Sequence, residues 1–83
     1  MPLVMKELIN KPWDYTFYEK SNLFYLSVMC GSVAIFEIII ELSSDETILF
    51  KNEGLDYIEK LAKQIQYSPS NFYARNVPKD SLS

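Results

Sequence analysis

Hydrophobic and polar residues follow three different patterns along this chain. In residues 13–20, WDYTFYEK, apolar and polar side chains alternate, which is typical of a half-buried β-strand. Residues 22–42, NLFYLSVMCGSVAIFEIIIEL, are mostly apolar. From Ile48 to Ile65 apolar residues recur at helical spacing. The pattern therefore predicts strands first and a helix afterwards.

The apolar stretch at residues 22–42 admits three interpretations. One is a membrane-spanning helix from Leu23 to Leu42, although Glu37 and Glu41 offset much of the insertion free energy that the apolar side chains supply. A second is an amphipathic helix. The run of β-branched residues and the Gly31-Ser32 dipeptide favour the third interpretation, a β-hairpin.

The second hairpin's register follows from which face each charged residue would occupy, because a one-residue slip moves every side chain to the other face. A two-residue Gly31-Ser32 turn would place Glu41 on the apolar face. We prefer a three-residue loop, residues 30–32, which pairs Val28 with Ala34 and keeps Glu37 and Glu41 on the opposite face.

The same argument from side-chain faces gives the register of the first hairpin. A two-residue turn at Ser21-Asn22 pairs Phe17 with Leu26, so that both hairpins share one apolar face. We therefore expect a three-stranded antiparallel β-meander over about 13–19, 23–29 and 33–42. The N-terminal Leu3-Val4-Met5 and Leu8-Ile9 could add a short helix or an extra edge strand.

A C-terminal helix is expected over about 45–66. Ser43 and Glu46 have the spacing of a capping box at its start, and Ser68-Pro69 provides the stop. Gly54 is unfavourable inside a helix, so this region forms either one bent helix or two joined helices. The expected fold class is α+β, with a single globular domain over residues 1–77 and a flexible tail over 78–83.

Composition restricts the function classes further. The chain has 83 residues, of which 48% are hydrophobic, and these values suit one small globular domain. One cysteine excludes an internal disulfide, and no signal peptide is visible, so we expect a cytoplasmic protein. The net charge is −3, and seven acids against Lys51 lie within residues 37–59. Nucleic acid is not an expected partner.

The candidate chemistry is sparse. Without histidine there is no imidazole base, no His-ligated metal and no Ser-His or Cys-His pair. Cys30 is expected to be a small buried or turn residue. We therefore expect a noncatalytic protein without catalytic, cofactor-binding or metal-binding residues. The alternative is a carboxylate cluster of Glu37, Glu41 and Asp45 that binds Mg²⁺ or Ca²⁺ in an accessory protein or enzyme.

The second face of the expected sheet is the candidate binding surface. Tyrosine and methionine are enriched in interface cores, and acids can steer a basic partner. The alternative is that the N-terminal segment covers this face. Arg75 is expected to be a solvated charge. The expected contact residues are Tyr18, Tyr25, Met29, Ile35, Glu37, Ile39 and Glu41.

The order of WDYTFYE, LSVMCGSVAIFEIIIELSSDE and GLDYIEKLAKQI, followed by a Ser-Pro and Arg75, resembles small uncharacterised bacterial single-domain proteins of the immunity or accessory type. The resemblance implies protein binding in the cytoplasm and transfers no functional residue. We accordingly expect a protein partner or a homodimer, with no nucleic acid and no membrane.

Overall fold

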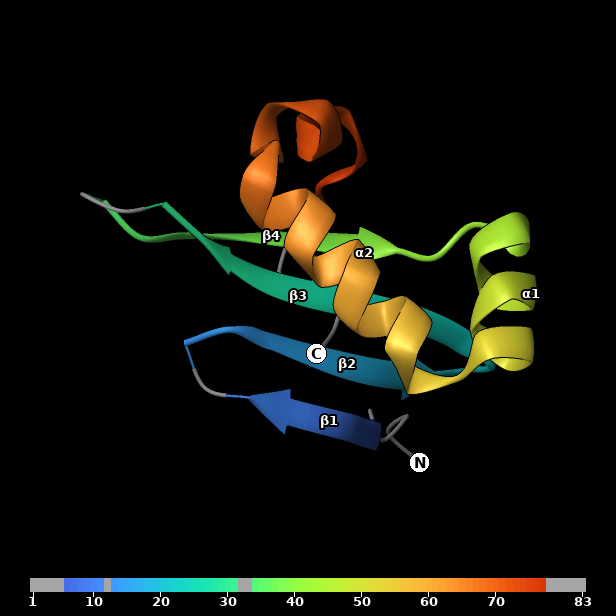
Figure 1. Ribbon diagram of the computed structural model, residues 1–83. Coiled ribbons are helices and arrows are strands. Elements are labelled where there is room, and N and C mark those ends of the chain that lie inside the picture. Colours follow the sequence, from blue (N-terminus) through green and yellow to red (C-terminus); the bar gives the residue numbers. More distant parts are fainter. Residues whose placement is uncertain (1–5, 12, 32–33, 78–83) are drawn as a thin grey trace.

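The apolar stretch at residues 22–42 forms two antiparallel strands of a four-stranded sheet (Figure 1). The computed structural model describes residues 6–11, 13–31 and 34–77. The sheet order is β1-β2-β3-β4, and the class is α+β, as the sequence predicts. The elements are β1 Lys6–Lys11, β2 Tyr15–Lys20, β3 Leu23–Cys30, β4 Phe36–Glu41, α1 Ser44–Glu53, α2 Leu55–Tyr67 and the 3₁₀ helix η1 Pro69–Arg75.

No helix in the described part of the chain is both long enough and apolar enough to cross a membrane.

The expected three-stranded sheet is one strand short, because β1 adds an edge strand. β1 pairs antiparallel with β2, and a bulge between Glu7 and Ile9 leaves Leu8 outside the ladder. Leu8 and Ile9 still pack against the core. Of the two alternatives for this segment, the edge strand is therefore correct. The expectation for Leu3-Val4-Met5, like that of a flexible tail over 78–83, lies outside the described residues.

The β2–β3 hairpin has the predicted register. Phe17 pairs with Leu26 and Tyr18 with Tyr25 across the two-residue turn. Both turn residues have positive φ, 53° at Ser21 and 66° at Asn22. This conformation matches the right-handed twist of the flanking strands.

The predicted register of the β3–β4 hairpin is wrong by four residues, since Val28 pairs with Ile38 instead of Ala34. A shift by an even number leaves every side chain on its predicted face. In the observed register Ile38 takes the place of Ala34 opposite Val28, and Ile38 is 1% exposed. At the other end of the hairpin the pairing continues to Leu42, whose N–H donates to the Phe24 carbonyl at 2.9 Å. Greater apolar burial therefore favours the observed register.

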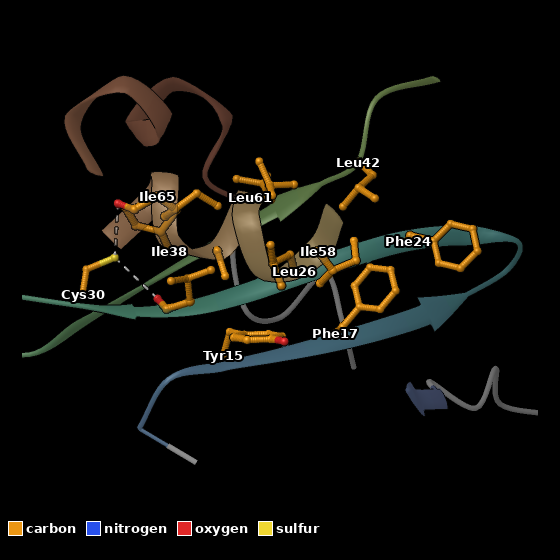
Figure 2. Packing of buried hydrophobic residues seen from close by; sticks show 13 residues of the cluster. Tyr15, Phe17, Phe24, Leu26, Cys30, Ile38, Leu42, Ile58, Leu61 and Ile65 are labelled. Atoms are coloured by element: carbon orange, nitrogen blue, oxygen red, sulfur yellow. Dashed lines mark hydrogen bonds between the residues drawn. The ribbon is translucent and has the colours of Figure 1, made fainter. Parts of the chain in front are cut away.

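Helix α2 lies across the inner face of the sheet and closes the core (Figure 2). Ile58 and Ile65 lie two turns apart on one helix face, and both are fully buried. Three aromatic rings fill the core near α1. Phe17 stacks on Phe24 at 5.6 Å between ring centroids, and Phe50 meets these rings edge-on at 5.0 and 5.2 Å.

Gly54 separates two helices, which resolves the alternatives for the C-terminal region. The predicted capping box is present, with Ser43 accepting from the Glu46 N–H and the Glu46 carboxylate accepting from the Ser43 N–H. At Gly54 the backbone has φ 78° and ψ −152°, a region essentially confined to glycine. The chain therefore turns here, with α1 at the end of the sheet and α2 crossing it (Figure 1).

The C-terminal segment protects the outer edge of β4. The Ile39 N–H donates to Asn76 Oδ1 at 2.9 Å, and the Val77 N–H donates to the Ile39 carbonyl at 2.8 Å. Unpaired strand edges promote association between chains. These two hydrogen bonds cover the β4 edge at its centre and so oppose pairing with another chain. On β1 the bulge and the terminal residues Lys6 and Lys11 oppose such pairing.

Candidate functional site

The outer face of the sheet contains a small second cluster. Tyr25 is 9% exposed and Ile39 is 3% exposed, and Tyr18 and Val77 pack against them. The Tyr25 hydroxyl donates to Glu41 Oε1 at 3.2 Å. Burial of the hydroxyl, together with this hydrogen bond and the negative charge of Glu41, raises the pKa of Tyr25. The described cover of this face therefore includes Val77, which comes from the C-terminal segment.

Burial in this second cluster separates two of the seven predicted contact residues from the other five. Tyr25 and Ile39 lie inside the second cluster, so they present little surface in this conformation. The other five residues are exposed or half-buried, and Ile35 is 58% exposed. These five are Tyr18, Met29, Ile35, Glu37 and Glu41.

The candidate carboxylates have local partners. Glu37 accepts a hydrogen bond from the Ser27 hydroxyl, and Glu41 accepts from Tyr25. Asp45 lies in the first turn of α1 and is exposed. Within the part of the chain that the structure describes, no three carboxylate or cysteine side chains are grouped so that they could hold a metal ion.

Cys30 is buried at the end of β3. It is 3% exposed, and its Sγ lies 3.7 Å from the Val28 carbonyl oxygen and 3.9 Å from that of Ile65. Burial raises the pKa of the thiol. Since the thiolate is the reactive form, this environment suits a packing residue rather than a nucleophile.

Arg75 is an ion-pair residue and not the solvated charge that the sequence suggests. Its Nη1 donates to Glu46 Oε2 at 3.0 Å, and its Nη2 donates to Glu46 Oε1 at 2.5 Å. Nη2 also donates to the Glu41 carbonyl at 3.0 Å. One guanidinium thus joins η1, α1 and β4. Nothing in the local sequence pairs these residues, which are 29 positions apart.

Exposed apolar side chains gather at one end of the domain, which we call the hairpin end. In an antiparallel meander the β1–β2 and β3–β4 turns lie at the same end of the sheet, as Figure 1 shows. The C-terminus of α2 reaches this end, and the ring of Phe36 lies 6.4 Å from that of Tyr73. The exposed residues of the hairpin end are Trp13, Ile35, Phe36, Tyr67 and Tyr73.

Trp13 is the most unusual residue of the hairpin end. It is 80% exposed and has φ 69°, a left-handed conformation that favours glycine or asparagine. The turn itself is firmly held, because the Asp14 N–H donates to the Lys11 carbonyl at 3.0 Å and the Asp14 carbonyl accepts from the Met29 N–H at 2.9 Å. The Gln66 amide donates to Asp14 Oδ1 at 2.7 Å. Strand and helix together hold Asp14, the residue next to the exposed indole.

Sequence reasoning missed this turn and assigned Trp13 to the start of a strand. The available signal was Lys11-Pro12-Trp13-Asp14, since proline and aspartate are common turn residues. The alternating pattern that follows concealed this signal.

A second apolar surface lies at the opposite end of the sheet. A shallow groove of about 470 Å³ runs between the β2–β3 turn and the start of α1, and it includes Leu23 and Ile48. Neighbouring Leu49 is also exposed, and α1 has no fully buried residue. The apolar side chains of this surface are aliphatic, whereas those of the hairpin end are mainly aromatic.

Comparison of the chain with protein-family models, with curated proteins and with solved structures found no match.

Proposed function

We propose that this protein is a noncatalytic binding domain that recognises a protein through the hairpin end and the adjoining part of the outer sheet face. The supporting observation is the set of five large apolar side chains exposed together at one end. Burying them against a partner is favourable, since apolar area removed from water stabilises a complex. Four of the five are aromatic, and aromatic residues are enriched in interface cores.

Part of the contact surface expected from sequence adjoins the hairpin end. Ile35 belongs to both sets, and Met29 pairs with Glu37 next to the Cys30–Phe36 pair. The proposed contact is thus apolar at its centre with Glu37 at its side. The net charge of −3 supports a protein partner over nucleic acid or an anionic membrane. We place the binding in the cytoplasm, where a lone thiol such as Cys30 stays reduced.

An affinity capture from the source cell tests the proposal. The bait is the wild-type chain, and the variant combines Ile35→Ser with Tyr73→Ser, two exposed positions of the hairpin end. The control combines Ile48→Ser with Leu49→Ser at the other end of the sheet. We expect the wild type and the control to retain the same protein and the variant to lose it, with unchanged circular dichroism.

Two results would contradict the proposal. One is retention of the same proteins by all three baits, which would exclude the hairpin end as the contact. The other is selective loss in the Ile48→Ser/Leu49→Ser chain, which would assign recognition to the groove beside α1.

A further inference from the structure

Trp13 contributes little to the packing of its own chain, yet it lies next to a residue that the fold holds firmly. Its side chain is 80% exposed and its backbone conformation is unfavourable for a bulky residue. The neighbouring Asp14 is bonded to Lys11, Met29 and Gln66, so the turn is held by β1, β3 and α2. Residues kept in such conformations concentrate at functional sites, and tryptophan is prominent among binding hot spots.

A pocket suited to an aromatic ring lies at the same end of the molecule. It occupies about 220 Å³ between the end of α2 and η1. Gln66, whose amide donates to Asp14 Oδ1, precedes the lining residue Tyr67 in α2, so the end of α2 connects the pocket to the Trp13 turn. Trp13 does not line this pocket in its own chain. The lining residues are Gln64, Tyr67, Ser68, Asn71 and Phe72.

We propose that Trp13 is the anchor of a homodimer and inserts into the pocket between α2 and η1 of a second copy of this chain. The inference rests on the proposed function, because it names the partner of the hairpin end. Because Trp13 and the pocket lie at the same end, two copies related by a twofold axis can each insert Trp13 into the pocket of the other. Such an interface is complete with two subunits. Two indoles would then be buried for each dimer.

The charges of the hairpin end suit contact between identical copies. The ammonium of Lys11 lies 3.9 Å from Glu59 Oε1, and that of Lys63 lies 3.9 Å from the same oxygen. The Asp14 carboxylate accepts from Gln66. Around the Trp13 turn two positive charges thus meet two negative ones, and Glu37 beside the hairpin end adds one negative charge, whereas the chain as a whole carries −3. Two copies approaching by this end meet less like-charge repulsion than by the acidic region.

The exposed area suits a weak dimer. At the exposed fractions of Trp13, Phe36, Tyr67 and Tyr73, the aromatic side chains offer roughly 400–650 Å² per copy. A standard interface buries about 800 Å² per partner, and smaller contacts are usually transient. We therefore expect association that depends on concentration in the micromolar to millimolar range.

Sedimentation velocity and fluorescence over about a hundredfold range of concentration test the dimer. Trp13 is the single tryptophan, so the emission reports on the proposed anchor alone. For the wild type we expect the mass to approach that of a dimer while the emission shifts to shorter wavelength. Trp13→Asn and Tyr67→Ser, both at exposed positions, should remain monomeric. Ile48→Ser, at the other end of the sheet, should dimerise like the wild type and show the same emission shift.

Three results would overturn the inference. They are a wild-type monomer at the highest concentration, a dimer that Trp13→Asn leaves intact, and dimerisation without a change in emission. None of them affects the capture experiment with the Ile35→Ser/Tyr73→Ser bait, so failure of the dimer and failure of the proposed function can be told apart.

Discussion

The guanidinium of Arg75 forms a bidentate ion pair with the carboxylate of Glu46, with Nη–Oε distances of 3.0 and 2.5 Å. The same carboxylate accepts from the Ser43 N–H at 2.8 Å, so it caps α1 and joins α1 to η1. Burial alone would raise the pKa of Glu46, but hydrogen bonds from Arg75 and Ser43 and the charge of Arg75 lower it overall. This pair links the C-terminal segment to the remainder of the domain.

The free energy of unfolding should therefore decrease in acid through Glu46. A carboxyl group with a lowered pKa in the folded state stabilises fully above its ordinary pKa of 4.5 and loses that contribution as pH falls through the folded-state value. Glu46→Gln should reduce this acid sensitivity and retain the cap. A double-mutant cycle with Arg75→Gln, followed by urea unfolding, should give a coupling of about 1 kcal/mol at pH 7, modest because solvent screens Arg75. A coupling near zero, or an unchanged acid profile in Glu46→Gln, would contradict this assignment.

Trp13→Asn should raise the stability of the monomer. Asparagine tolerates the left-handed conformation of Trp13, whereas a bulky side chain does not, so we expect a gain of about 0.5–1 kcal/mol. The measurement is urea unfolding followed by circular dichroism at high dilution. Trp13→Ala is the matched control, because it removes the indole and keeps the unfavourable φ. A clear loss of stability in Trp13→Asn would show that the indole serves the chain's own packing.

The β2–β3 turn should respond to its preferred residues. Ser21 and Asn22 both have positive φ, and Asn-Gly is the dipeptide that two-residue turns of this kind favour. Replacing Ser21-Asn22 by Asn-Gly should raise the free energy of unfolding by about 0.5–1 kcal/mol, as thermal melts can determine. Asn22→Ala should have the opposite effect. Equal melting temperatures for all three chains would mean that the turn tolerates these changes without cost.

Gly54 is needed for its backbone conformation and not for space. A Cβ atom at this position would have no neighbour within 4 Å, yet φ is 78°. Gly54→Ala should therefore cost about 1–3 kcal/mol through backbone strain alone. D-alanine, introduced by chemical synthesis, suits this conformation and should match or exceed glycine in stability. A similar loss with both alanine enantiomers would point instead to an unexpected steric conflict.

The local pattern of the sequence predicts much of this fold. The alternation in YTFYEK, the Ser21-Asn22 turn and the Ser43–Glu46 capping box each depend on residues close in the chain, and the structure confirms them. The two sheet faces are also as predicted, because the period of a strand is two and an error of four residues preserves it.

Long-range contacts decide the features that the pattern misses. The β3–β4 register depends on burying Ile38 and Ile40 under α2, which a loop-length argument does not weigh. The candidate contact surface changes for a related reason, since Tyr25 and Ile39 are buried in a cluster with Val77 from a distant segment.

The sequence by itself therefore determined the α+β class, the strand faces and the start and stop of the region that α1 and α2 occupy, because each follows from neighbours a few residues apart. Only the tertiary structure decided the register of β4, the Arg75–Glu46 pair and the exposure of Trp13 at the end of a rigid turn. Those features depend on which segments meet in space, and such meetings are selected by total burial and hydrogen bonding over the whole domain.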